Sequence, residues 1–138
     1  MDDDIIEVLD DDECWEALRA DELGRLAYRL ADEVNIVPLN YAVDGETLLF
    51  RTAEGSKLLG VVMDADVVLE IDGHDDQFAQ SVIVRGVARV LSEAEEHRVE
   101  NVALRPWLDT LKYNVVEIRP TRITGRRFKL GPRGDGTA

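Results

Sequence analysis

The chain has 138 residues, of which 45% are hydrophobic, and its formal net charge is −13 at pH 7. This charge excludes general binding to nucleic acid and to anionic membranes, because both need a basic protein surface. The length and composition predict one domain over residues 1–130, followed by a flexible tail over 131–138. The acidic N-terminus, the lack of an apolar run near the ~20 residues of a spanning helix, and a single cysteine, Cys14, favour a cytoplasmic protein.

Local patterns predict a series of strands interrupted by a few helices. Alternating apolar and polar residues indicate half-buried strands, and capping residues before an apolar pattern indicate helices. The polar segment 73–80 is expected to be a loop. In chain order we expect a helix after Asp10, strands over 23–30, 35–43 and 47–52, a helix over 57–63, strands over 65–72 and 81–91, a helix from Ser92 to about Ala103, and strands over 113–119 and 122–128.

A few residues sharpen these expectations. Pro38 cannot donate to a strand ladder, so it predicts an edge strand, a bulge or a bend. Asp44-Gly45 is a hairpin signal. Gly86, inside a long strand, predicts a bulge or a close approach of two backbones. Ser92 and Glu95 have the spacing of a capping box, which predicts the start of a helix.

The predicted fold is mainly β, of the α+β kind. Most of the expected strands follow one another without an intervening helix, which argues against a doubly wound parallel sheet. Six or seven short strands with two or three peripheral helices indicate an antiparallel barrel.

Charge is unevenly spread, since acids dominate the first sixteen residues and arginines dominate 119–133. These segments are either two solvated surfaces or partners that meet within one chain or across a dimer.

Several kinds of active site have no support in the sequence. His74 and His97 are far apart and lie in no zinc-ligand spacing, so no metal site is predicted. For His74, in an acidic segment, a solvated loop and a metal or substrate contact both stay open. No Walker loop or nucleophile elbow is present, and no pair of carboxylates stands out as general acid and base. Cys14 lacks a cationic neighbour in sequence, so we expect a packing role for it.

The turn after the strand over 47–52 concentrates hydrogen-bond donors. Arg51, Thr52, Ser56 and Lys57 lie within seven residues, just before a predicted helix. One interpretation is a helix cap, in which a hydroxyl accepts a backbone N–H and the lysine lies in solvent. The other is an anion site, where hydroxyls, positive side chains and helical N–H groups bind a phosphate ester.

The order of the elements and the residues together resemble the pyridoxamine 5′-phosphate oxidase-like flavoproteins, over residues 12 to 128. The resemblance implies their FMN-binding split β-barrel. It does not extend to vitamin B6 oxidation, because the substrate-binding C-terminal segment of the true oxidases has no match. The motifs that carry it are Gly24-Arg25-Leu26-Ala27, Val37-Pro38-Leu39-Asn40-Tyr41, Phe50-Arg51-Thr52 with Gly55-Ser56-Lys57, and Val84-Arg85-Gly86.

The resemblance also implies a cofactor site shared by the two subunits of a homodimer. One strand would lie along the isoalloxazine ring, the turn after residue 50 would hold the phosphate and ribityl chain, and a second subunit would complete the pocket. For Trp107, stacking in the pocket and closing the end of the barrel both stay open. The implied cofactor-binding residues are Val37, Pro38, Leu39, Asn40, Arg51, Thr52, Ser56, Lys57, Ser81 and Trp107.

The expected function is that of an FMN-dependent oxidoreductase acting on an unidentified small molecule. The flavin would carry the chemistry and the protein would orient it, which agrees with the absence of an acid–base pair. Three alternatives remain open at this point: a flavin carrier or sensor without turnover, a member of the same fold that binds the deazaflavin F420 or haem, and a structural dimer with an empty pocket.

Overall fold

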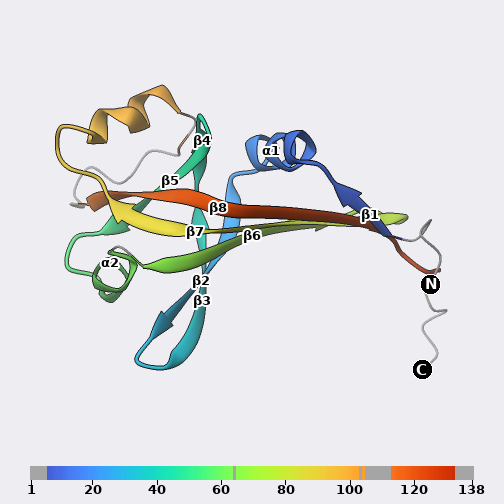
Figure 1. Ribbon diagram of the computed structural model, residues 1–138, viewed down its shortest axis with the longest axis horizontal. Coiled ribbons are helices and arrows are strands. Elements are labelled where there is room, and N and C mark those ends of the chain that lie inside the picture. The colour runs from blue at the N-terminus through green and yellow to red at the C-terminus, as the bar shows by residue number, and fades with distance from the viewer. Residues whose placement is uncertain (1–5, 64, 103, 105–112, 133–138) are drawn as a thin grey trace.

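The computed structural model describes residues 6–63, 65–102, 104 and 113–132. They form one curled antiparallel sheet with helices packed on it (Figure 1). The helices are α1 (Asp11–Ala20), α2 (Lys57–Val62) and the 3₁₀ helix η1 (Glu96–Asn101). The strands are β1 (Ile6–Leu9), β2 (Leu23–Leu30), β3 (Glu33–Asn40), β4 (Ala42–Asp44), β5 (Thr47–Ala53), β6 (Asp66–His74), β7 (Phe78–Val90) and β8 (Tyr113–Lys129).

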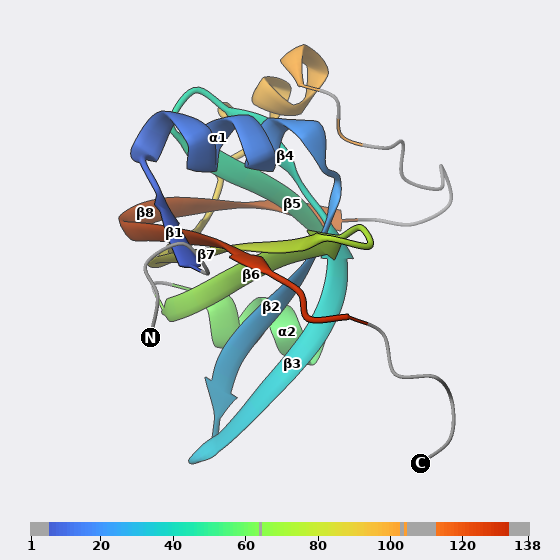
Figure 2. The same ribbon diagram turned by 90° about the vertical axis from the view of Figure 1, so that its right-hand side faces the viewer.

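The sheet runs in the order β3-β2-β6-β7-β8-β5-β4, and β1 adds to β8. The 17-residue β8 pairs with β7 along most of its length. Its other edge pairs first with β5 and then, beyond residue 124, with β1. Figure 2 shows the sheet curling under α1, with the β2–β3 hairpin projecting from it. The predicted antiparallel split-barrel class is confirmed.

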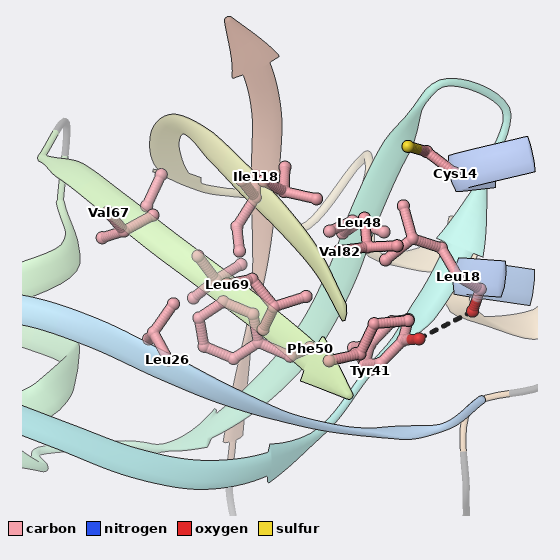
Figure 3. Close-up of a cluster of buried hydrophobic side chains, with 14 of the residues drawn as sticks. Cys14, Leu18, Leu26, Tyr41, Leu48, Phe50, Val67, Leu69, Val82 and Ile118 are labelled. Carbon is pink, nitrogen blue, oxygen red and sulfur yellow. Dashed lines mark hydrogen bonds between the residues drawn. The ribbon is translucent and has the colours of Figure 1, made fainter. Parts of the chain in front are cut away.

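The concave face of the sheet holds the main core, which α1 covers (Figure 3). Leu18 of α1 and Phe50 of β5 are completely buried there. The Tyr41 hydroxyl, also buried, donates a 2.7 Å hydrogen bond to the backbone carbonyl of Leu18. Cys14 packs in the same cluster, and burial, followed by the nearby acids of α1, raises the pKa of its thiol. The packing role expected for this cysteine is confirmed.

The opposite face of the sheet is covered at one end by η1. A buried carboxylate, Glu117 of β8, accepts hydrogen bonds from Arg98 of η1 at 2.6 Å and from Arg89 of β7 at 3.3 Å. Arg98 also binds Asp44 at 2.7 Å, which ties η1 to the β4–β5 hairpin. Arg89 pairs bidentately with Glu95, and this pairing lowers the pKa of Glu95 to about 2. These contacts fix η1 over the first half of β8.

Several sequence-based expectations were confirmed. Asp10 caps α1 in a full capping box with Glu13. Pro38 lies on the edge strand β3, and Gly45, with φ of +60°, turns the β4–β5 hairpin. Gly86 marks a register shift where β7 meets β8. The acidic N-terminal and arginine-rich C-terminal segments do meet, because β1 pairs with β8.

Other expectations were wrong. The segment 73–80 is mostly strand, since β6 extends to His74 and β7 starts at Phe78, leaving a short turn. The two strands expected around Pro120 are one strand, because the missing N–H of this proline falls at the β7–β8 irregularity. No α-helix starts at Ser92. The carboxylate of Glu95 accepts from both the Ser92 backbone and Arg89, and the chain forms the 3₁₀ helix η1 instead.

The short strand β1 was not expected at all. The tail expected over 131–138 lies outside the described residues from 133 onward. No helix in the described ranges is long and apolar enough to cross a membrane.

Candidate functional site

The turn between β5 and α2 brings two of the predicted site residues together. The hydroxyl oxygens of Thr52 and Ser56 are 3.0 Å apart, and Ser56 also accepts a 3.1 Å hydrogen bond from the backbone N–H of Leu59. Gly55, with φ of +79°, allows the chain to turn here. Ser56 is therefore the N-cap of α2. The part of the helix-cap interpretation in which a hydroxyl accepts a backbone N–H is confirmed, and the Thr52 side chain beside it is buried.

Arg51 lies on the other side of β5. Successive side chains of a strand point to opposite faces, so Arg51 and Thr52 cannot share one face. The Arg51 guanidinium carbon lies 4.9 Å from the ring centre of Tyr113, in a cation–π geometry. Tyr113 was not predicted as a site residue, and its only sequence signal is an aromatic ring at the start of the last strand. Of Lys57, the structure describes the backbone, which starts α2.

The predicted ring-binding strand is β3, at the free edge of the sheet. Its residues alternate in exposure, so Val37 and Leu39 pack against the main core while Pro38 and Asn40 face outward. β3 also contacts β5, although the two strands are not neighbours in the sheet order. The predicted ring-binding strand and the predicted phosphate-binding turn therefore adjoin the same core.

Ser81 is distant from that turn within one chain. Thr52 is paired with Asn114 of β8, whereas Ser81 is paired with Arg126 of β8. These partners are twelve positions apart, or about 40 Å at the rise of a β-strand. One chain therefore does not bring Ser81 to Thr52 and Ser56. Trp107 lies outside the described residues.

Histidine and acidic residues form no recognisable metal centre. In the part of the chain that the structure describes, no group of three His, Cys, Asp or Glu side chains could hold a metal ion. His74 is exposed at the end of β6, next to the turn into β7. On β6, Glu70 and Asp72 share Arg25, at 3.1 and 2.8 Å. Burial and the neighbouring Asp72 raise the pKa of Glu70.

Comparison with known proteins gives a consistent family. The family model described as pyridoxamine 5′-phosphate oxidase matches residues 10–127. An uncharacterised protein of Mycobacterium tuberculosis is 45% identical over 94 residues, which cover 67% of this chain and 86% of that protein. A solved structure from Mycobacterium smegmatis, described as an FAD binding protein, is 42% identical, with a TM-score of 0.83, and covers 91% of this chain and 100% of that one.

A second solved structure, from Corynebacterium glutamicum, is 40% identical with a TM-score of 0.83, over 96% of this chain and 99% of that one. The family model spans nearly all of the described strands, from α1 to Arg127, two residues before the end of β8. The sheet order and the sequence motifs thus agree with these matches, and the chain belongs to the pyridoxamine 5′-phosphate oxidase-like family of split β-barrel proteins.

Proposed function

We propose that this protein binds a phosphate-bearing flavin and acts as an oxidoreductase on a small molecule. The observation that carries the proposal is its likeness, along the whole fold, to the mycobacterial protein described as FAD-binding. FMN is the form expected from the sequence motifs. The description of that relative makes FAD the second candidate.

The residues of this chain suit such a ligand. The turn after β5 holds two hydroxyls 3.0 Å apart, one of them on the buried Thr52, and Arg51 supplies a guanidinium at the same end of β5 but on its opposite face. One edge of β3 faces no other described strand, so part of its backbone can hydrogen-bond with the polar rim of a flavin ring. A bound flavin would supply hydride or electron transfer, and these residues would bind and orient it.

We further propose a homodimer in which each subunit completes the other's pocket. The distance between Ser81 and the turn at Thr52 means that both can touch one flavin only if they come from different chains. The exposed face of β3 supports such an assembly, because Val34 and Ile36 are 67% and 64% exposed there. Adjacent apolar side chains on a surface often mark an interface, and a twofold axis uses such a patch twice.

The absorption spectrum of the purified protein tests the flavin proposal. The protein is expected to show the two bands of an oxidised flavin, and chromatography of the released cofactor should identify FMN or FAD. A deazaflavin spectrum, a haem Soret band, or a colourless protein that fails to take up added FMN and FAD would contradict it.

Arg51→Ala tests the phosphate contact. We expect this variant to bind FMN about 1–3 kcal/mol more weakly, the scale of hydrogen bonds to charged groups. Riboflavin has no phosphate and serves as the internal control, since its affinity should hardly change. Calorimetric titration of both flavins into the cofactor-free protein makes the comparison. Equal losses for both flavins would assign Arg51 to the shape of the pocket and not to the phosphate.

A further inference from the structure

A groove on the outward face of β7 and β8 is rich in arginine. Val82 and Val84 of β7 point into the core, so Ser81, Ile83 and Arg85 point away from it. Directly opposite these three residues on β8 are Arg126, Thr124 and Arg122. With Val8 of β1 at one end, these side chains line a groove with a volume of about 440 Å³.

The positive charges in this groove have no ion-pair partner among the residues that the structure describes. Arg85 and Arg122 are direct cross-strand partners, an arrangement that is destabilising for like charges. Neither they nor Arg126 form an ion pair or a side-chain hydrogen bond with any residue in the described ranges. This is unusual for a chain with 29 acidic and 16 basic residues.

Of the nearby acids, Asp66 of β6 lines a cavity with Arg85, and Asp11 and Glu46 line another with Arg122, whereas two further acids of β6 are already engaged. Glu70 and Asp72 of β6 lie opposite Ile83 and Ser81, one strand away from β8. Both carboxylates bind the same guanidinium, that of Arg25, at 3.1 and 2.8 Å. Because no ion pair within the described ranges involves the three arginines, an anion from outside the chain would compete only with the unpaired acids of the two cavities nearby.

The β7–β8 irregularity explains why the arginines are uncovered. Before it, the outward side chains of β8 include Val115 and Glu117, which are buried beneath η1 and its neighbours. After it, the outward positions are Arg122, Thr124 and Arg126, beyond the reach of η1. The outward side chains in the first half of β8 are thus buried beneath η1, whereas those in the second half include exposed arginines.

We propose that Arg85, Arg122 and Arg126, with the hydroxyls of Ser81 and Thr124, bind the phosphate groups of a small molecule. Guanidinium groups match phosphate oxygens in a bidentate geometry, and hydroxyls can add further donors. A neighbouring cavity of about 460 Å³ shares Arg85 and is lined mainly by apolar groups, among them Ala27 and Val68. Both volumes are in the range of small-molecule sites. A ligand can place its phosphates on the arginines and its apolar body toward β2.

The phosphates can come from two sources. One is the diphosphate of FAD bound in a partner's pocket, a reading that rests on the proposed function and dimer. The other is a separate phosphorylated substrate, which needs no flavin contact with the groove. The two sources share the same chemistry, so the site is tested first and its occupant second.

Inorganic pyrophosphate is the probe for the site. Calorimetric titration at constant ionic strength, on the protein as purified and after removal of any flavin, should give saturable binding in at least the flavin-free form. Arg122→Gln and Arg126→Gln should each weaken this binding at least tenfold. Arg127→Gln is the matched control, because it removes the same charge one residue away, where the guanidinium stacks on Phe78 at 4.5 Å. Circular dichroism checks that each form is folded.

The outcomes separate the proposals. The proposed phosphate site is refuted if pyrophosphate shows no saturable binding to wild type in either form, or if it binds all variants with equal affinity. Pyrophosphate binding that persists beside a retained flavin assigns the groove to a separate substrate. Binding only after flavin removal, with less FAD retained by Arg122→Gln, assigns it to the diphosphate of the cofactor. If the protein takes up no flavin but still binds pyrophosphate, the proposed flavin function is refuted and the phosphate site in the groove is supported.

Discussion

Tyr41 connects the strand layer to α1 through one buried hydrogen bond. Its hydroxyl donates to the Leu18 carbonyl, in the last turn of α1, where no further helical N–H follows to satisfy that oxygen. Burial raises the pKa of Tyr41, so the phenol stays protonated and keeps its donor. Tyr41→Phe leaves a buried carbonyl without its partner and should cost about 1–3 kcal/mol of unfolding free energy.

Urea unfolding checks this prediction as a lower midpoint at an unchanged slope. Tyr28→Phe is the control. Tyr28 is half-buried at the edge of the same core, and its hydroxyl makes no hydrogen bond to any residue in the described part of the chain. An equal effect of the two substitutions would mean that the Tyr41 hydrogen bond contributes little.

Gly86 allows β7 and β8 to approach each other closely at their register shift. A Cβ at this position would lie 2.5 Å from the Arg119 carbonyl oxygen and 2.9 Å from Ile118. The close contact is with backbone, which cannot move aside without opening the β7–β8 ladder. Gly86→Ala is therefore expected to destabilise the protein by about 1–3 kcal/mol, the usual range for an overpacked site.

Gly60→Ala is the matched substitution for comparison. Gly60 lies inside α2 with no atom within 4 Å of the added Cβ, so alanine should stabilise the helix by up to about 1 kcal/mol. Thermal unfolding should shift in opposite directions for the two variants. A neutral Gly86→Ala would show that the two strands separate easily at their irregularity.

Elements with a local signal could be predicted from the sequence. The cap at Asp10, the turn at Gly45 and the edge position of Pro38 each follow from the chemistry of one or two residues. The family motifs placed Thr52 and Ser56 in one turn, and their hydroxyls are indeed adjacent.

Features that depend on distant partners could not be predicted. Segment 73–80 looks polar, yet most of it is strand because β6 and β7 pair through it. Glu95 has the spacing of a cap, but its carboxylate also pairs with Arg89, six residues back on β7. The arginine groove likewise follows from cross-strand register, since Arg85 and Arg122 are far apart in sequence.

At the scale of the molecule, the proposed dimer makes Ile36 a decisive position. A lysine at this exposed position of β3 would place a charge in the apolar contact, so Ile36→Lys should shift the protein to monomer and lower its flavin content. Light scattering and the flavin-to-protein absorbance ratio measure the two effects. Met63→Lys, which charges a 59% exposed methionine after α2, should leave the dimer intact. A wild-type monomer that retains flavin would refute the dimer.

The position of β8 also determines when this sheet can be completed during synthesis. β8 is the last of the described strands along the chain, yet β1, β5 and β7 all pair with it. A nascent chain that has not yet exposed residues 113–129 outside the ribosome therefore presents unpaired edges on all three strands, a template for aggregation. Folding of the whole sheet must follow, and cannot accompany, translation of its first hundred residues. Rapid emergence of β8, or a chaperone that covers these edges, would shorten this exposure.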